Sequence, residues 1–228
     1  MIAAKKSAWF EHGFRYYNRY LLKKTFAQIA MDQLDLCEGA VLLCCNHVAW
    51  WDPLVLFFLN EQRWHKDAYG FMGHEGLTAY PFFRKLGAFS LDDRDPRDVL
   101  RGFRYALSIL QKKDALLIWF AQGEEKHPEA RPLGFSPGLA KLYTLAKHQN
   151  CSFSLKFLSL RYDFLERKKP EILISTKNPY ANDDPLAFEK IATEQLTTLT
   201  NTIASWTTNE RRITPGFTPL LRRDGQEV

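Results

Sequence analysis

Short apolar runs alternate with segments of helical periodicity along most of the chain, and together they predict the fold class. Strands are expected at residues 40–45, 68–72, 115–120, 153–162 and 171–175. Helices are expected to begin near Pro53, Pro96, Pro137 and Pro185, since each proline follows an Asp or Ser whose side-chain oxygen can cap a first turn. This alternation predicts a single α/β domain with a mixed, mostly parallel sheet flanked by helices.

Residues 7–30 carry a different pattern, in which aromatic and basic side chains alternate. Phe10, Phe14, Tyr17 and Leu21 recur at helical spacing, and Lys and Arg residues lie between them. We expect an amphipathic helix or helix pair within an N-terminal segment, residues 1–35. Its apolar face would either enter a membrane interface or pack on the core. Residues 36–206 form the main domain of this scheme, and the tail, 207–228, is expected to be loosely structured.

Composition narrows the cellular setting without fixing the function. The 228 residues carry a formal net charge of +5, concentrated near the N-terminus, and four cysteines that show no C-x-x-C spacing. We expect these cysteines to be reduced core residues. No apolar run approaches the roughly 18–20 residues that a membrane-spanning helix needs, and no signal peptide is evident. A protein at the cytoplasmic face of the membrane, attached peripherally, is the expected localisation.

The segment from Asn46 to Asp52 is the strongest candidate for chemistry. His47 comes just after a predicted buried strand, and Asp52 stands five positions later, at the start of the next helix. A carboxylate that accepts from one imidazole nitrogen orients the ring, so that the other nitrogen can remove a proton from a hydroxyl. Alternatively, Asp52 is only a helix cap and His47 only satisfies a loop carbonyl.

Asn46-His47 followed by Asp52 resembles the H-x-x-x-x-D motif of the glycerol-phosphate and lysophospholipid acyltransferases. A second block of that family, which ends here in Asp93-Arg94, follows in the same order. By this resemblance Arg94 would contact the phosphate of the acceptor. Its other interpretation is a surface arginine paired with a neighbouring aspartate.

The third block of the family reads roughly F-P-E-G-T-R, and the chain departs from it. Gln122 replaces the acid, Gly123 is kept, and Glu125 stands where the family has arginine. A guanidinium grips a phosphate, whereas a carboxylate repels one. Arg131, a few positions later, is a candidate to compensate. The resemblance covers about residues 36–165.

The resemblance implies an O-acyltransferase that moves a fatty acyl group from acyl-CoA or acyl carrier protein to a lipid hydroxyl. The acceptor would be similar to 1-acylglycerol-3-phosphate, in phospholipid biosynthesis, and residues 36–206 would be the acyltransferase domain. The implied catalytic residues are His47 and Asp52, and the implied substrate-binding residues are Asn46, Arg94, Gln122, Gly123 and Arg131. No cofactor or metal is expected, and the expected partners are the lipid, the thioester, a membrane surface and acyl carrier protein.

Gln122 and Glu125 leave two alternatives open. The acceptor can be a lipid without phosphate, such as a glycolipid or an amino-acid lipid, or the chain can be a non-catalytic lipid-binding member of the fold. Five apolar residues after His47 would line an acyl groove or belong to the core: Trp50, Trp51, Leu54, Phe57 and Phe58.

Three other classes of function fit the sequence less well. Gly134 to Gly138 matches the G-x-S-x-G pattern of serine hydrolases, but it follows a loop rather than a strand, and the histidine order is wrong. The cysteines and histidines lack zinc-ligand spacing. Because no nucleic-acid-binding motif accompanies the basic N-terminus, we expect no nucleic-acid partner.

Overall fold

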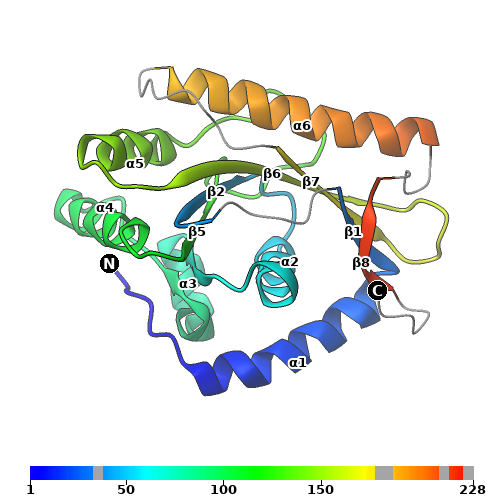
Figure 1. Cartoon of the computed structure of the whole chain (residues 1–228), viewed down its shortest axis with the longest axis horizontal. Coiled ribbons are helices and arrows are strands. Elements are labelled where there is room, and N and C mark those ends of the chain that lie inside the picture. The colour runs from blue at the N-terminus through cyan, green and yellow to red at the C-terminus, as the bar shows by residue number, and fades with distance from the viewer. Residues whose placement is uncertain (33–37, 178–186, 211–215, 223–228) are drawn as a thin grey trace.

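One sheet organises the fold (Figure 1). The structure is a computed structural model of the whole chain and describes residues 1–32, 38–177, 187–210 and 216–222. Within these residues the sheet has eight strands in the order β4-β3-β5-β2-β6-β7-β1-β8. The strands are β1 Gln28–Met31, β2 Val41–Cys45, β3 Asp67–Phe71, β4 Ala88–Phe89, β5 Ala115–Phe120, β6 Ser154–Asp163, β7 Glu171–Lys177 and β8 Thr218–Arg222.

The sheet is mixed but mostly parallel. Strand β2 lies in the middle and pairs in parallel with β5 on one side and β6 on the other. Only the pairs β6–β7 and β1–β8 are antiparallel. The carboxyl ends of β2 and β5 therefore meet at the same edge of the sheet, and the loops that follow them start side by side. The predicted α/β class and single domain with a mixed, mostly parallel sheet are confirmed.

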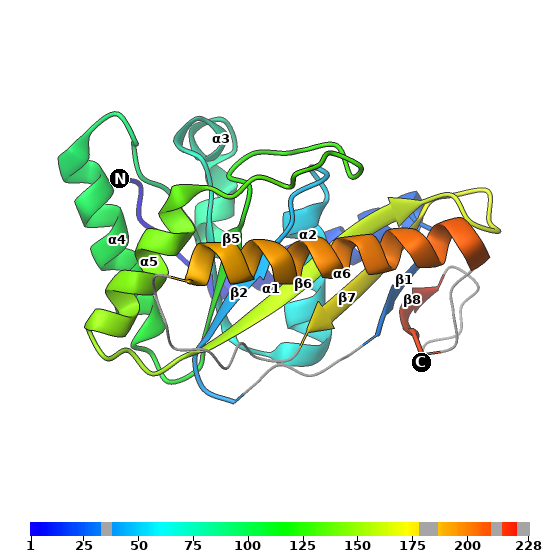
Figure 2. The ribbon, with the colours of Figure 1, turned by 90° about the horizontal axis from the view of Figure 1, so that it is seen from above.

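Helices cover both faces of the sheet, as Figures 1 and 2 show. Helices α4, α5 and α6 pack on one face, and α1 and α2 pack on the other. The helices are α1 Ala8–Thr25, α2 Asp52–Leu59, α3 His74–Ala79, α4 Pro96–Leu110, α5 Pro137–His148 and α6 Phe188–Glu210, with a π-helical segment at Asn60–Trp64 and a 3-10 helix at Pro81–Leu86.

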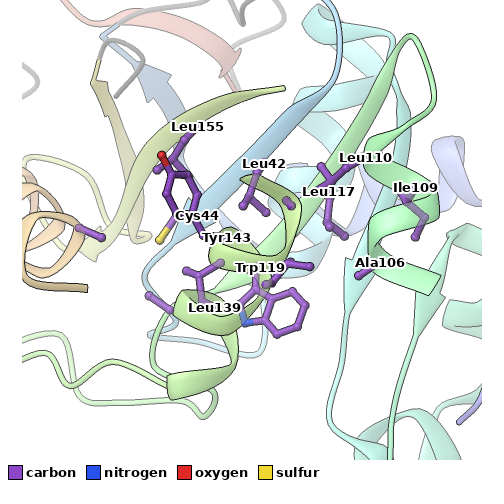
Figure 3. Close-up of a cluster of buried hydrophobic side chains, with 14 of the residues drawn as sticks. Leu42, Cys44, Ala106, Ile109, Leu110, Leu117, Trp119, Leu139, Tyr143 and Leu155 are labelled. Atoms are coloured by element: carbon purple, nitrogen blue, oxygen red, sulfur yellow. The ribbon is translucent and has the colours of Figure 1, made fainter. Parts of the chain in front are cut away.

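Alternating side chains of the central strands fill the two cores. Leu42, Cys44 and Trp119 point toward α4 and α5, where Figure 3 shows them with Tyr143. Cys45 points the other way, into the cluster beneath α2. Cys44 and Cys45 are free and fully buried on opposite faces, as expected from their adjacent positions in a strand.

The two ends of the chain differ from the expectation. The N-terminal helix stops at Thr25, and Gln28–Met31 forms a buried strand rather than more helix. Within the tail, Thr218–Arg222 pairs with that strand at the edge of the sheet, so this part is ordered. Neither segment shows the alternation that predicts a strand from sequence. Long-range pairing rather than local propensity forms both strands.

The prediction of helix starts from a capping residue followed by proline is confirmed in part. Asp95 caps α4 through its side chain, which accepts a hydrogen bond from the Arg97 amide. Ser136 takes the N-cap position of α5 without a side-chain bond. The expected start near Pro185 lies outside the described residues. Among the described residues, no helix combines the length and the apolar composition that a membrane-spanning segment requires.

Candidate active site

His47, in the loop after β2, faces Asp52, the first residue of α2. Their side chains are joined by a hydrogen bond of 2.8 Å between His47 Nδ1 and Asp52 Oδ2. Asp52 is fully buried, whereas the His47 side chain keeps 16% of its surface exposed. The imidazole therefore has one nitrogen fixed to a carboxylate, and its second nitrogen, Nε2, remains free for a substrate.

The carboxylate of Asp52 organises the loop rather than capping the helix. Its Oδ2 accepts from the backbone amides of Val48 and Ala49, at 2.7 and 3.1 Å. Trp51 occupies the N-cap position of α2 and makes no side-chain cap bond. The interpretation of Asp52 as a simple helix cap is therefore wrong. Because the same oxygen holds both the loop and the ring, the turn presents His47 in one orientation.

Tyr162, on the neighbouring strand β6, completes the environment of Asp52. Its hydroxyl donates to Asp52 Oδ1 at 2.6 Å. Burial, followed by the nearby charge of Asp52, raises the pKa of Tyr162 well above its usual value. The hydroxyl therefore stays protonated and acts as a permanent donor, which locks the second oxygen of the carboxylate.

Three further residues hold the backbone and ring of His47. Asn46 is buried and continues the sheet pairing, since its amide donates to the Leu160 carbonyl at 2.9 Å and its Oδ1 accepts from the Leu160 amide at 2.7 Å. Gln122 Oε1 accepts from the His47 amide at 2.6 Å. The ring of Phe120 stacks on the imidazole, with centroids 4.1 Å apart. Gln122 thus holds the histidine backbone, Asn46, the preceding residue, is anchored to β6, and neither residue lines the cavity.

The loop after β5 closes the other side of His47. Gly123 adopts a positive φ of 76°, and a Cβ there would lie 3.3 Å from the Ser136 Cβ, so a glycine suits this turn. After the turn the chain comes back, and the Lys126 amide donates to the His47 carbonyl at 2.9 Å. Glu125 lies between Gly123 and Lys126 in the sequence, and its Oε1 is 4.0 Å from His47 Nε2.

A largely apolar cavity of about 170 Å³ opens in front of His47. It extends from His47, Gly123 and Glu125 along β3 and β5 toward Ala68 at the start of β3. Three of the five proposed groove residues line it, namely Trp50, Leu54 and Phe57. Trp51 and Phe58 belong to the core clusters instead. The free nitrogen of the histidine therefore faces a space suited to hydrocarbon.

The two candidate arginines lie outside this cavity. Arg94 is exposed and pairs with Asp92, at 3.2 Å between Nε and Oδ1, which is the surface arrangement considered as its alternative. Arg131 donates to the Asn201 side chain and to two loop carbonyls. The structure thus brings Asn46, His47, Asp52, Gln122 and Gly123 together, and leaves Arg94 and Arg131 apart.

Other chemistries find little support in the geometry. Ser136 sits at the start of α5, after a loop, and not on a strand-to-helix elbow. Burial raises the pKa of the Cys45 thiol, with added contributions from Cys44 and Asp52, so this thiol next to the site is a poor nucleophile. No group of three or more metal-ligating side chains is found in the described parts of the chain.

A histidine–aspartate pair thus lies at the carboxyl edge of a mostly parallel sheet, beside a largely apolar cavity. The model of the family described as Acyltransferase matches residues 16–155, more than half of the chain. The chain therefore belongs to the Acyltransferase family. No curated protein matched the sequence significantly.

Two solved structures match this chain to different degrees. The crystal structure of the 1-acyl-sn-glycerophosphate (LPA) acyltransferase PlsC from Thermotoga maritima matches with a TM-score of 0.58 and 11% identity, over 85% of this chain and 79% of that one. This likeness concerns the fold. The Legionella pneumophila ATPase DotB matches with a TM-score of 0.41 and 8% identity, over 79% of this chain and 59% of that one, which is too weak to bear on the fold.

Sequence reasoning missed Tyr162 and Phe120 as parts of the site. Tyr162 lies 110 positions beyond Asp52 and reaches it only because β6 pairs with β2. Phe120 could have been found, since it ends the predicted strand that precedes Gln122, and a strand that ends beside β2 places its last side chains near His47.

Proposed function

We propose that the protein transfers a fatty acyl group from a thioester to a lipid hydroxyl, with His47 as the general base. The observation that carries this proposal is the 2.8 Å bond between His47 and Asp52 beside the apolar cavity. Membership of the Acyltransferase family supports the transfer of an acyl group. Acyl-CoA and acyl carrier protein are the two donor classes that fit.

The proposed reaction needs no group beyond these side chains and the two substrates. The acceptor hydroxyl gives its proton to His47 Nε2 as its oxygen attacks the thioester carbonyl carbon. The tetrahedral intermediate then collapses, the carbon–sulfur bond breaks, and the leaving thiolate takes the proton from His47. Asp52 holds the imidazole and stabilises its protonated form, and Tyr162 holds Asp52 in place. No acyl-enzyme forms.

The cavity accounts for the acyl chain. Each buried methylene gains about 0.8 kcal/mol, so a long chain stays in protein or bilayer rather than in water. Phe57, Phe71 and Phe83 contribute apolar surface to the cavity wall, and glycines on β3 and beside it leave room between them. A thioester carbonyl at His47 with its chain in this cavity is the arrangement that the lining favours.

We also propose that α1 attaches the protein peripherally to a membrane. Trp9, Tyr16 and Tyr20 are 90%, 62% and 60% exposed, and their spacing of seven and four residues places them on one side of the helix. The opposite side packs on the protein through Phe14, which contacts Phe57 of the cavity wall. Aromatic side chains favour the boundary between head groups and acyl chains, so α1 would bring the cavity to its substrate.

The test of the chemistry is product analysis by mass spectrometry. Purified protein is incubated with acyl-CoA or acyl carrier protein thioester and a panel of lysolipids, beside the His47→Ala variant. We expect acylated lipid from the native protein and a loss of about 10²–10⁴-fold in the variant. Equal product from a correctly folded His47→Ala protein would remove His47 from the mechanism. Lipid binding without any acyl transfer would favour the non-catalytic alternative.

The test of the membrane surface is vesicle sedimentation. Replacing Trp9, Tyr16 and Tyr20 together by serine is expected to weaken binding to phosphatidylglycerol-containing vesicles by about tenfold or more, because each ring buries apolar area. Leu100→Ser is the matched control, since Leu100 is half exposed on α4, on the other face of the sheet. Unchanged binding of the triple variant would contradict the role of α1.

A further inference from the structure

A carboxylate stands beside the point where the acceptor hydroxyl must react. Glu125 lines the cavity with 50% of its side chain exposed, and its Oε1 lies 4.0 Å from His47 Nε2. Nε2 is the nitrogen left free, because Nδ1 is bonded to Asp52. Whatever group the acceptor carries next to its reacting hydroxyl will therefore meet the negative charge of Glu125.

No lysine or arginine lines the cavity in the described parts of the chain. Among the described residues that line it, those with ionisable side chains are His47, Tyr69 and Glu125. The cations of the loop after β5 are engaged elsewhere, since Lys126 pairs with Glu124 and Arg131 donates to Asn201. A phosphate next to the reacting hydroxyl would consequently find a like charge and no guanidinium to hold it.

A carboxylate in this place can accept hydrogen bonds from hydroxyl groups. His47 Nε2 and Glu125 Oε1 are two acceptors 4.0 Å apart, so they can receive donors from two neighbouring hydroxyls of one molecule. Solvent screens the attraction of this half-exposed carboxylate for an ammonium group just as it screens its repulsion of a phosphate, and bringing either ion into a largely apolar cavity carries a desolvation cost that an uncharged hydroxyl avoids. The geometry thus favours an uncharged head group with adjacent hydroxyls.

We propose that Glu125 is a specificity-determining residue that selects an acceptor lipid with an uncharged polyol head group and rejects one with a phosphate beside the reacting hydroxyl. This rests on the proposed acyl transfer. One hydroxyl of the polyol gives its proton to His47 and becomes the ester oxygen, as in the reaction above. The neighbouring hydroxyl donates to Glu125, which keeps its charge and exchanges no proton.

Competition between three acceptors tests this assignment. The probes are 1-acylglycerol-3-phosphate, dodecyl glucoside and a long-chain amino alcohol, each supplied with palmitoyl-CoA, and kcat/KM is measured by mass spectrometry. We expect the native protein to prefer the glucoside over the phosphate lipid by about tenfold or more, because mismatched charge at a substrate site is strongly rejected. Preference for the phosphate lipid or for the amino alcohol would overturn the assignment.

Three variants isolate the contribution of Glu125. Glu125→Arg is expected to move the ratio of phosphate lipid to glucoside by about tenfold or more in favour of phosphate, and Glu125→Gln to move it less in the same direction. Glu124→Arg is the matched control, because this adjacent, exposed glutamate makes the same charge change without lining the cavity. Its ratio should stay within about twofold. An unchanged ratio in both Glu125 variants would contradict the proposal.

The release of coenzyme A distinguishes failure of the acceptor assignment from failure of the chemistry. His47-dependent thiol release, with the phosphate lipid or the amino alcohol as the best acceptor, leaves the proposed function intact and overturns the role of Glu125. Thiol release that none of the acceptors intercepts also overturns the polyol assignment. The absence of any His47-dependent release would overturn the proposed function itself, and the assignment of Glu125 with it.

Discussion

The two loops that meet at His47 are held in different ways. In residues 46–52, after β2, the Asp52 carboxylate is fully buried and accepts from His47, from two backbone amides and from Tyr162. In residues 121–131, after β5, Glu125 is half exposed and faces the cavity. Hydrogen bonds thus fix the buried carboxylate of the first loop, whereas the carboxylate of the second loop is half exposed.

Under the proposed function, this difference separates the chemistry from the choice of acceptor. A buried polar network tolerates little change, because each lost partner leaves a desolvated group without compensation. An exposed side chain on a loop can be replaced at small cost to stability. Substitutions around Asp52 should therefore lower the rate with every acceptor alike, while substitutions in the second loop should change the ratio between acceptors.

The largest effect is expected for Asp52→Asn. The asparagine can still accept from the Val48 and Ala49 amides, but it no longer supplies a charge to stabilise protonated His47. We expect kcat to fall by about 10²–10⁴-fold. Steady-state kinetics with two acceptors, beside a melting curve of each protein, provides the measurement. A fall in kcat with only one of the two acceptors would contradict the proposed division of roles between the two loops.

A smaller effect of the same kind is expected for Tyr162→Phe. The variant leaves Asp52 Oδ1 without its donor, and a hydrogen bond to a charged group contributes about 1.5–3 kcal/mol. We expect a loss in kcat of the order of tenfold with every acceptor, and little change in KM. If Tyr162 only supports the fold, thermal stability will fall while kcat of the remaining folded protein stays at the native value.

The smallest effects are expected at the two arginines outside the cavity. Arg94 pairs with Asp92 at the surface, and Arg131 bonds to Asn201. Arg94→Ala and Arg131→Ala should each change kcat/KM by less than about twofold, since exposed pairs contribute little. The assay is the same kinetic comparison of acceptors. A large loss with the phosphate lipid alone would return a phosphate-binding role to the altered residue.

Local patterns predicted the centre of the fold and missed its edges. The strand at Ala115–Phe120 and the helix that begins at Pro96 stand where apolar runs and a capped proline indicated them. Gln28–Met31 and Thr218–Arg222 form one edge of the sheet only through each other and β7. Neither short segment contains enough periodicity to show such pairing in advance.

The residues of the site also divide into those that the sequence predicts and those that it does not. His47 and Asp52 could be found from sequence, because they stand five positions apart between a strand and the first turn of a helix, in a pattern that resembles the acyltransferase motif. Tyr162 could not, because its contact depends on the pairing of β6 with β2. The positions of Arg94 and Arg131 depend on the tertiary structure, which a motif does not specify, and both lie outside the cavity beside surface partners.

The most direct test of the mechanism is a double-mutant cycle between His47 and Asp52. His47→Ala, Asp52→Asn and the double variant are compared with the native protein by the rate of acylated lipid formation. If Asp52 acts through the imidazole, its substitution will have almost no further effect once His47 is absent, and the two losses will be far from additive. Fully additive losses would contradict the account, because the two residues would then act independently.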